Sequence, residues 1–152
     1  VIGCEYVPLG VSVAISVADG AATDTTLRAV KEALVRVLWP LAGGGFDGQG
    51  WRRKRAVSNR ELAVEVARVA GVDEINGINL FTADTKGAWS ALGDARDGRE
   101  QNLAIGDWQF PELLRVTVVD SPEAPFELPS LNANPFADAD AVAVPVVTEF
   151  CQ

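Results

Sequence analysis

The sequence contains no histidine and no methionine, and its only cysteines are Cys4 and Cys151. Zinc sites are built from clustered cysteine and histidine, and proton transfer at neutral pH usually needs histidine, so we expect no metal, no cofactor and no enzymatic activity. The two cysteines lie near opposite ends, and we expect buried thiols in a reducing compartment rather than a disulfide. Because no methionine stands at position 1, we also expect the C-terminal part of a longer polypeptide.

Long hydrophobic runs are also absent. A membrane-spanning helix needs about 20 consecutive apolar residues, and no run in this sequence approaches that length. The chain has 152 residues, of which 48% are hydrophobic, which is enough to bury a sizeable core. We therefore expect a single domain that does not insert into a membrane.

Positive charge is scarce except in one place. The formal net charge is −8, and residues 101–152 contain eight acidic residues against the single base Arg115. Residues 51–60, by contrast, contain five bases and no acid. Affinity for nucleic acid depends on a summed positive field, so the overall charge argues against nucleic acid as a partner. Patches of opposite sign favour protein partners instead.

The first half of the chain alternates between strand and helix patterns. Apolar residues recur at every second position over residues 6–20, which predicts a strand with one buried face. Helical spacing follows from Thr23 or Asp24, either of which is a suitable N-cap, and ends before Pro40.

A second helix and a second strand follow the first pair. Ser58 and Glu61 have the spacing of a capping box, and Gly71 is suited to the end of the helix that they begin. Residues 72–81 then predict a strand with a bend or bulge at Asn76-Gly77. The fold class is therefore α+β, with two helices packed on a small mixed sheet.

The second half divides into an inserted loop region and an extended arm. We assign residues 1–82 to the core, 83–112 to an insertion folded over it, and 113–152 to a return strand and a proline-rich C-terminal arm. The return strand is predicted at residues 113–119. The arm ends in a second apolar segment, which we expect to be an edge strand or a strand lent to a neighbour through Val144, Val146 and Phe150.

The two helices are joined by "WPLAGGGFDGQGWRRKR", residues 39–55. A phosphate-binding loop would follow a strand and open a helix, whereas this segment follows a helix and leads into a tryptophan and four cations. The cations form either a solvated turn or a contact with acidic protein, and among the functional interpretations protein contact leads. We assign partner binding to Arg52, Arg53 and Lys54.

From the first helix to the second strand, the chain resembles the C-terminal region of baseplate J-like wedge proteins. In that family a helix ends in a Pro-Leu-x-Gly-Gly segment, followed by Gly-Trp, an Arg-x-Val strand and a Glu-Leu helix start, and that helix closes with Gly-Val. The resemblance covers residues 6–82, and Lys54 and Arg60 depart from the family pattern. The matching residues are Pro40, Leu41, Gly43, Gly44, Gly50, Trp51, Arg55, Val57, Glu61, Leu62, Gly71 and Val72.

The resemblance implies a structural role in a contractile phage tail or a phage tail-like contractile injection system. Such a wedge protein links the hub and spike to the sheath and rearranges when the particle is triggered. The implied partners are other baseplate subunits, namely the wedge partner, the hub and the sheath, and further copies of the chain within a ring. The implied location is a tail-like particle assembled in the bacterial cytoplasm.

Two other functions are compatible with the sequence. Trp89 and Trp108 in the insertion could together recognise a carbohydrate or another cell-surface ligand. Acidic residues such as Asp94, Asp97 and Glu100 could serve a hydrolase, but they lie in the most polar stretches, where a raised pKa is not expected. A tryptophan fluorescence shift with a glycan would favour the first of these two functions.

Overall fold

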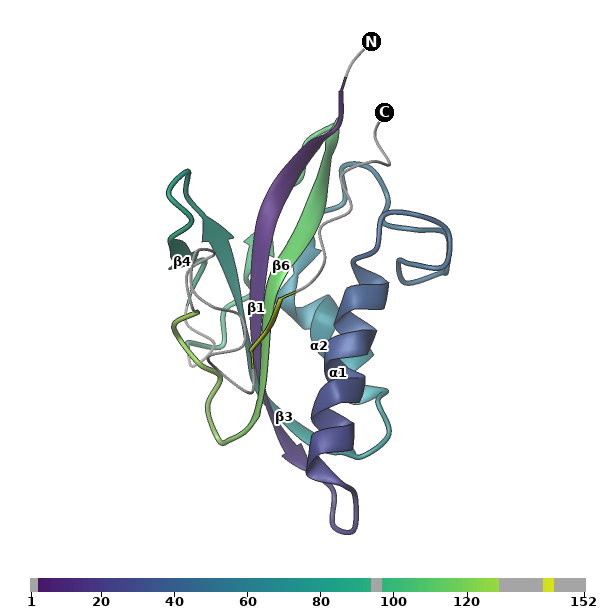
Figure 1. Cartoon of the computed structure of the whole chain (residues 1–152), viewed down its shortest axis with the longest axis vertical. Helices are drawn as coiled ribbons and strands as arrows, with labels where there is room; N and C mark the ends of the chain where they lie inside the picture. The colour runs from purple at the N-terminus through teal and green to yellow at the C-terminus, as the bar shows by residue number, and fades with distance from the viewer. Residues whose placement is uncertain (1–2, 94–96, 129–140, 144–152) are drawn as a thin grey trace.

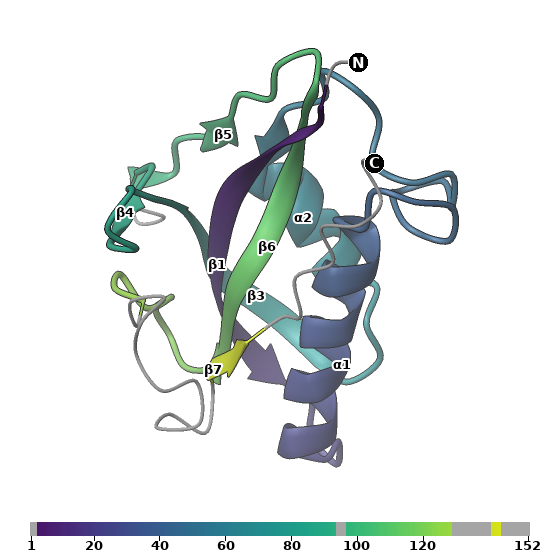
Figure 2. The same ribbon diagram turned by 45° about the horizontal axis from the view of Figure 1, so that its top comes forward.

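The computed structural model describes residues 3–93, 97–128 and 141–143. It is an α+β fold in which two helices pack against a five-stranded mixed sheet of order β4-β3-β1-β6-β7, beside a two-stranded sheet of β2 and β5 (Figures 1 and 2). This confirms the predicted fold class. The elements are β1 (Glu5–Val17), α1 (Thr23–Val37), β2 (Val57–Ser58), α2 (Asn59–Ala67), β3 (Val72–Ala83), β4 (Trp89–Ala91), β5 (Asn102–Leu103), β6 (Gln109–Asp120) and β7 (Ala141–Ala143).

Strand β1 lies at the centre of the main sheet and explains its mixed character. It pairs antiparallel with β3 and parallel with β6, so its two edges are both hydrogen-bonded. The alternation seen in the sequence places one set of side chains beneath the helices, and all of them are fully buried. Ser12 and Ala14 on the opposite face are fully buried as well, so the prediction of a single buried face is wrong. This set comprises Leu9, Val11, Val13 and Ile15.

Helix α1 begins where the sequence predicts, but its cap differs from the prediction. The N-cap residue is Ala22, whose side chain cannot accept a hydrogen bond, so neither Thr23 nor Asp24 caps the helix. Thr26 instead donates its hydroxyl to the Ala22 carbonyl oxygen at 2.9 Å. The helix ends at Val37, before Pro40, as expected.

Helix α2 has half of the expected capping box. The Ser58 hydroxyl oxygen accepts a hydrogen bond from the Arg60 N–H at 3.2 Å, which confirms Ser58 as the N-cap. Glu61 forms an ion pair with Arg55 at 2.9 Å, and the Ser58 hydroxyl donates to Glu100 at 2.7 Å. The other half of the expected box is not formed, because the Glu61 carboxylate, which was expected to accept from a backbone N–H at the start of the helix, pairs with the Arg55 side chain instead.

The predicted bulge in β3 is confirmed at Asn76. The pairing of β1 with β3 skips this residue, so Ala14 faces Gly77 while Ile15 faces Ile75. The side-chain amide of Asn76 donates to the Ser16 hydroxyl at 3.0 Å and to the Ser121 carbonyl oxygen at 2.7 Å. The bulge thus fixes the point at which the chain leaves β6.

The region between β3 and β6 contributes to the core as well as covering it. Leu103 and Ile105 are each 7% exposed and belong to the main hydrophobic cluster, and β5 pairs with β2. Strand β6 begins at Gln109, four residues before the predicted start of the return strand. After β6, residues 121–128 run over the sheet face away from the helices, where the Pro125 carbonyl oxygen accepts hydrogen bonds from Ser12 and Asn79.

Cys4 is disulfide-bonded, so the expectation of two thiols is wrong for this residue. The chain's other cysteine, Cys151, lies outside the described residues. Within the described part of the chain, no helix is long and apolar enough to cross a membrane.

Candidate functional site

The connector between α1 and β2 is closed on itself by backbone hydrogen bonds. The N–H groups of four of its five glycines donate to carbonyl oxygens of the same connector or of the end of α1. A phosphate-binding loop would direct such groups toward a ligand, and here they are occupied by the protein. The bonds are Gly43 to Gly48 at 2.8 Å, Gly44 to Leu41 at 3.0 Å, Gly45 to Val37 at 3.0 Å, Gly50 to Gly44 at 2.8 Å, and Trp51 to Trp39 at 3.0 Å.

Three glycines in this connector are required by crowding, and one of them is Gly45, where a Cβ atom would overlap the backbone oxygen of Gly50. A Cβ atom at Gly44 would overlap the backbone oxygen of Trp39, and one at Gly50 would overlap those of Pro40 and Leu41. Gly50 also has φ +88°, in the region that side chains rarely adopt. The Pro-Leu-x-Gly-Gly and Gly-Trp positions therefore meet in one tight reversal.

Trp51 fills the space beside this reversal, as the sequence predicts. Its side chain is 4% exposed, and its ring centroid lies 5.5 Å from that of Phe46. The indole N–H donates to the Arg55 carbonyl oxygen at 3.0 Å. The Arg55 guanidinium lies 4.6 Å from the Phe46 centroid and forms an ion pair with Glu61, so the tryptophan is enclosed on several sides.

The last pair of matched residues lies beyond the end of α2. This helix ends at Ala67 with Arg68 as its C-cap, so the prediction that Gly71 ends it is wrong. Gly71 has φ +94°, and a Cβ atom there would meet the Thr26 side chain of α1. Its carbonyl oxygen accepts from the Ala18 N–H at 2.8 Å, and Val72 begins β3. Gly71 therefore sets the spacing between the start of α1 and the strand that follows α2.

The three cations assigned to partner binding all contact the chain itself. Arg52 pairs with Asp47 at 2.6 Å, and Lys54 pairs with Asp107 at 2.8 Å. Arg53 lies over the Trp108 ring, 4.8 Å from its centroid. The side chains of Arg52 and Lys54 are nevertheless 69% exposed, so these contacts hold them in place without burying them.

We refer to Arg52, Arg53, Lys54, Asp107 and Trp108 as the connector surface. Trp108 is 45% exposed, and its neighbours carry three positive charges and one negative charge. Arg52 also shapes the chemistry of Asp47, because its hydrogen bond, together with one from the Gln49 N–H, holds the pKa of this carboxyl below its ordinary value of 3.8. The remaining residues assigned to partner binding, Val144, Val146 and Phe150, lie outside the described residues.

The structure places Trp89 and Trp108 in different environments. Trp89 belongs to β4 and lies over Gly10 of β1, and its indole N–H is buried without a hydrogen-bond partner. Trp108 lies at the start of β6, against Arg53. Trp89 is partly buried and of this pair only Trp108 is exposed, so a binding site that needs both rings is not favoured by their positions.

Two small surface cavities flank the aromatic residues of the connector. One, of about 210 Å³, is lined by Phe46, Trp51 and Arg55 among others, and another of about 340 Å³ shares Phe46 and Arg55. A larger groove of about 500 Å³ lies along α1 and is lined by Val35 and Trp39 among others. In the described part of the chain, no group of three or more cysteine, aspartate and glutamate side chains is arranged to hold a metal ion.

Comparison with models of known protein families found no match, and comparison with curated proteins found none either. The assignment of function therefore depends on the geometry and on the resemblance described above.

Several residues that matter to this arrangement were missed in the sequence. Gln101 is 3% exposed and connects β3 to α2, but a single glutamine in a polar stretch carries no periodic signal. Glu112 has a pKa raised above its ordinary value of 4.5 by partial burial, which its place in a strand did not reveal.

Proposed function

We propose that this chain is a structural component of the baseplate wedge in a phage tail-like contractile particle, where it links the hub and spike to the sheath and rearranges on triggering. The observation that carries this proposal is the closed connector, in which four of the five glycine N–H groups bond to the protein's own carbonyl oxygens beside the buried Trp51. Such a connector offers partners a shaped surface instead of free donors for a small ligand. It is also the segment that resembles the wedge family.

The connector surface is the part of the molecule that we assign to subunit contact. Its cations are held in defined positions by Asp47, Asp107 and Trp108, so little side-chain entropy is lost when a partner binds. An exposed tryptophan beside arginine is typical of the residues that dominate protein interfaces. We infer that the partners are the neighbouring wedge subunit, the hub and the sheath, together with copies of this chain in a ring.

The acidic balance of the chain bears on the kind of partner. With a net charge of −8, the protein repels nucleic acid except near the connector, whereas an acidic protein surface can meet the connector cations locally. The proposed site of assembly is the bacterial cytoplasm, within the growing particle.

The direct test is to tag the chain in the cell that produces it, purify contractile particles and determine which proteins they contain. We expect the chain in the baseplate in a fixed ratio to the sheath and hub proteins. Electron microscopy of the purified protein with its partners should show rings or wedges. Particles that assemble and contract without the chain would exclude this function.

A charge-reversal variant tests the assigned surface. Changing Arg52, Arg53 and Lys54 together to glutamate should slow association with the partner subunits, and added salt should slow association of the wild type. The matched control changes Arg60 and Arg68 to glutamate, because these α2 cations are similarly exposed but lie outside the connector surface. Equal association rates for both variants, with no effect of salt, would remove the connector surface from the proposal.

A further inference from the structure

The smaller of the two cavities beside the connector combines aromatic walls with two arginines. The Arg55 guanidinium lies 4.6 Å from the Phe46 ring centroid and 5.7 Å from that of Trp51, within the range of cation–π contact. The Arg55 side chain is still 35% exposed, so a group outside the protein can reach it. The cavity adjoins the connector surface, with which it shares Arg52. Its lining is Phe46, Asp47, Gly50, Trp51, Arg52 and Arg55.

The charged side chains of this lining have unused donors. A guanidinium has five N–H groups, and in the described part of the chain that of Arg55 donates one hydrogen bond, from Nη2 to Glu61 at 2.9 Å. Arg52 likewise donates one, to Asp47 at 2.6 Å. Both carboxylate oxygens of Asp47 already accept hydrogen bonds, since the other oxygen is bound by the Gln49 N–H at 3.0 Å. A group that binds in this cavity must therefore supply acceptors.

The charges around the cavity favour a negative group. Three of the four cations at residues 52–55 form ion pairs with one acidic side chain each, and the fourth, Arg53, lies over the Trp108 ring. This cluster of paired side chains therefore has one more positive than negative charge, and a single carboxylate would balance it.

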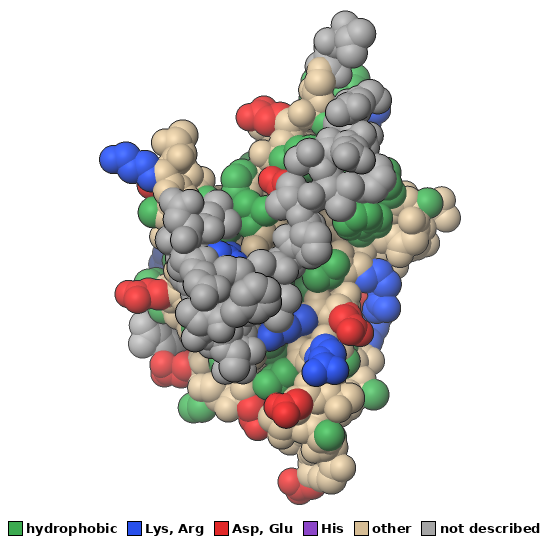
Figure 3. Space-filling view, viewed as in Figure 1, with side chains coloured by type: hydrophobic (Ala, Val, Ile, Leu, Met, Phe, Trp, Pro, Cys, Tyr) green, Lys and Arg blue, Asp and Glu red, His purple; other side chains and the backbone are tan. Residues whose placement is uncertain are grey.

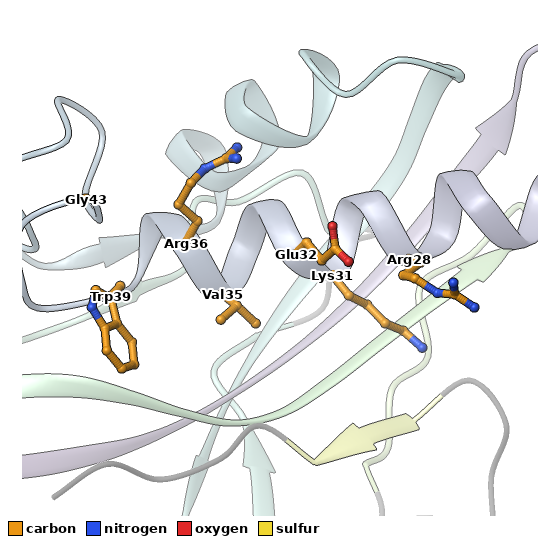
Figure 4. Close-up of a pocket in the computed structure, with 7 residues that line it drawn as sticks. All are labelled: Arg28, Lys31, Glu32, Val35, Arg36, Trp39 and Gly43. Atoms are coloured by element: carbon orange, nitrogen blue, oxygen red, sulfur yellow. The ribbon is translucent and has the colours of Figure 1, made fainter.

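The groove along α1 does not offer the same arrangement. On the face of the molecule drawn in Figure 3, which includes α1, basic and acidic side chains lie beside one another, so neither sign dominates it. The cations of the groove also diverge, because Arg28 and Lys31 project to one side of the helix and Arg36 to the other (Figure 4). An acidic group therefore fits the smaller cavity better, where two arginines border the same space.

We propose that this cavity binds the carboxylate of an aspartate or glutamate side chain from a neighbouring protein subunit, with Arg55 and Arg52 as the donors. The carbon chain of that residue packs against Phe46 and Trp51. Arginine presents its N–H groups in a planar fork that matches the two oxygens of a carboxylate. The volume of about 210 Å³ is smaller than the roughly 300–1,000 Å³ of sites for whole small molecules, and it suits one side chain.

This inference rests on the proposed function for the identity of the neighbouring subunit, and it adds the chemical group that the subunit supplies. The probe for testing it is glutamate capped with acetyl and methylamide groups, whose side chain carries its only charge. NMR of the Arg55 Nε–H and the Trp51 indole N–H can follow a titration of the purified full-length chain.

We expect saturable shifts of both signals with capped glutamate, and an affinity at least fivefold lower for capped glutamine, because the neutral amide loses the charge-assisted hydrogen bonds. The absence of a saturable shift, or equal affinities for the two probes, would overturn the proposal. Free glutarate that bound at least tenfold more tightly than capped glutamate would assign the cavity to a small dicarboxylic acid and would also overturn it.

Two variants test the assigned donors. Changing Arg55 to lysine keeps the charge beside Glu61 but removes the planar fork, and it should weaken binding of capped glutamate at least fivefold. Changing Arg52, which is 69% exposed, to glutamine should also weaken binding and leaves the enclosure of Trp51 intact. The matched control changes Arg68 to lysine, because Arg68 also pairs with a glutamate of α2, at 2.8 Å, but does not line this cavity. Unchanged affinity in either cavity variant, or an equal loss in the control, would contradict the assignment.

The titration and the particle test can fail separately, because the titration needs only the purified chain. A chain that binds capped glutamate but is missing from contractile particles would keep its carboxylate site and lose the proposed function. A chain that is found in the baseplate but does not bind capped glutamate would keep the proposed function and lose this site.

Discussion

The side chain of Gln101 completes the hydrogen bonding of β3 at Leu80, where the short strand β4 has ended. Its carbonyl oxygen accepts from the Leu80 N–H at 2.8 Å, and its amide nitrogen donates to the Asn79 side chain at 3.1 Å. The backbone of Gln101 exchanges hydrogen bonds with Asn59 at the start of α2, at 3.0 and 3.1 Å. One residue of the insertion thus joins β3 to α2.

Changing Gln101 to leucine should destabilise the protein by about 2–3 kcal/mol, because a buried N–H that loses its acceptor costs about 1–3 kcal/mol and the Asn79 side chain loses its donor as well. Urea unfolding measures the difference. The neighbouring Asn102 is exposed and provides the control. Changing it to alanine should leave the free energy of unfolding within about 0.5 kcal/mol of the wild-type value. Equal losses for the two variants would contradict the role assigned to Gln101.

Gly50 and Gly48 form a matched pair for testing the connector. Both have positive φ, at +88° and +79°, but a Cβ atom at Gly48 meets nothing within 4 Å, whereas one at Gly50 meets the backbone oxygens of Pro40 and Leu41. Changing Gly48 to alanine should lower the free energy of unfolding by about 1 kcal/mol, because of the backbone conformation alone. Changing Gly50 to alanine should lower the free energy of unfolding by about 1–3 kcal/mol more than this, because the backbone of Pro40 and Leu41 must also move. Similar midpoints of thermal unfolding for the two variants would show that the reversal is not crowded.

Arg52 should control the acidity of Asp47. The Arg52 hydrogen bond is the main cause of the lowered pKa of this carboxyl, with the Gln49 N–H second. Changing Arg52 to alanine should therefore raise the Asp47 pKa toward 3.8, as measured by NMR of the carboxyl carbon during an acid titration. Because the folded pKa is lowered, the stabilisation by this pair is present above pH 3.8 and is lost as the pH falls through the folded value. Arg53 to alanine is the control, since Arg53 lies over Trp108, and an equal shift in that variant would contradict the assignment.

Glu112 should make stability depend on pH in the opposite sense. Partial burial raises its folded pKa above 4.5, so its contribution to stability is complete below pH 4.5 and is lost as the pH rises through the folded pKa. A glutamine at this position stays neutral, so the stability of the variant relative to the wild type should increase between pH 4 and pH 7. Unfolding in urea at several pH values measures this, and parallel curves would refute it.

Tyr6 provides a second measure of the Glu112 charge. Its pKa is raised above 10.0 mainly by burial and then by repulsion from ionised Glu112. It is the only tyrosine in the sequence, so phenolate absorbance reports it alone. The glutamine variant should lower the Tyr6 pKa while leaving part of the elevation caused by burial. An unchanged alkaline titration would show that the two side chains do not interact.

The features that depend on residues close together in the chain were determined by the sequence itself. The alternation of β1, the spacing of α1, the Ser58 cap, the Asn76 bulge and the glycine reversal beside Trp51 each depend on residues within one or two turns of chain. Short-range steric and hydrogen-bonding preferences are enough to specify such features. They also include the residues that carry the family resemblance.

Only the tertiary structure decided how distant segments share their polar groups. The Ser58 hydroxyl donates to Glu100, Gln101 completes β3, and Asp107 meets Lys54, although 42, 21 and 53 positions separate the partners. These pairings depend on the path by which residues 83–112 return to the core, and no local pattern encodes that path. A polar side chain in a loop forms a hydrogen bond with the buried donor or acceptor that the fold brings beside it. Leaving that buried group without a hydrogen bond would cost more free energy than the local conformational preference of the loop supplies.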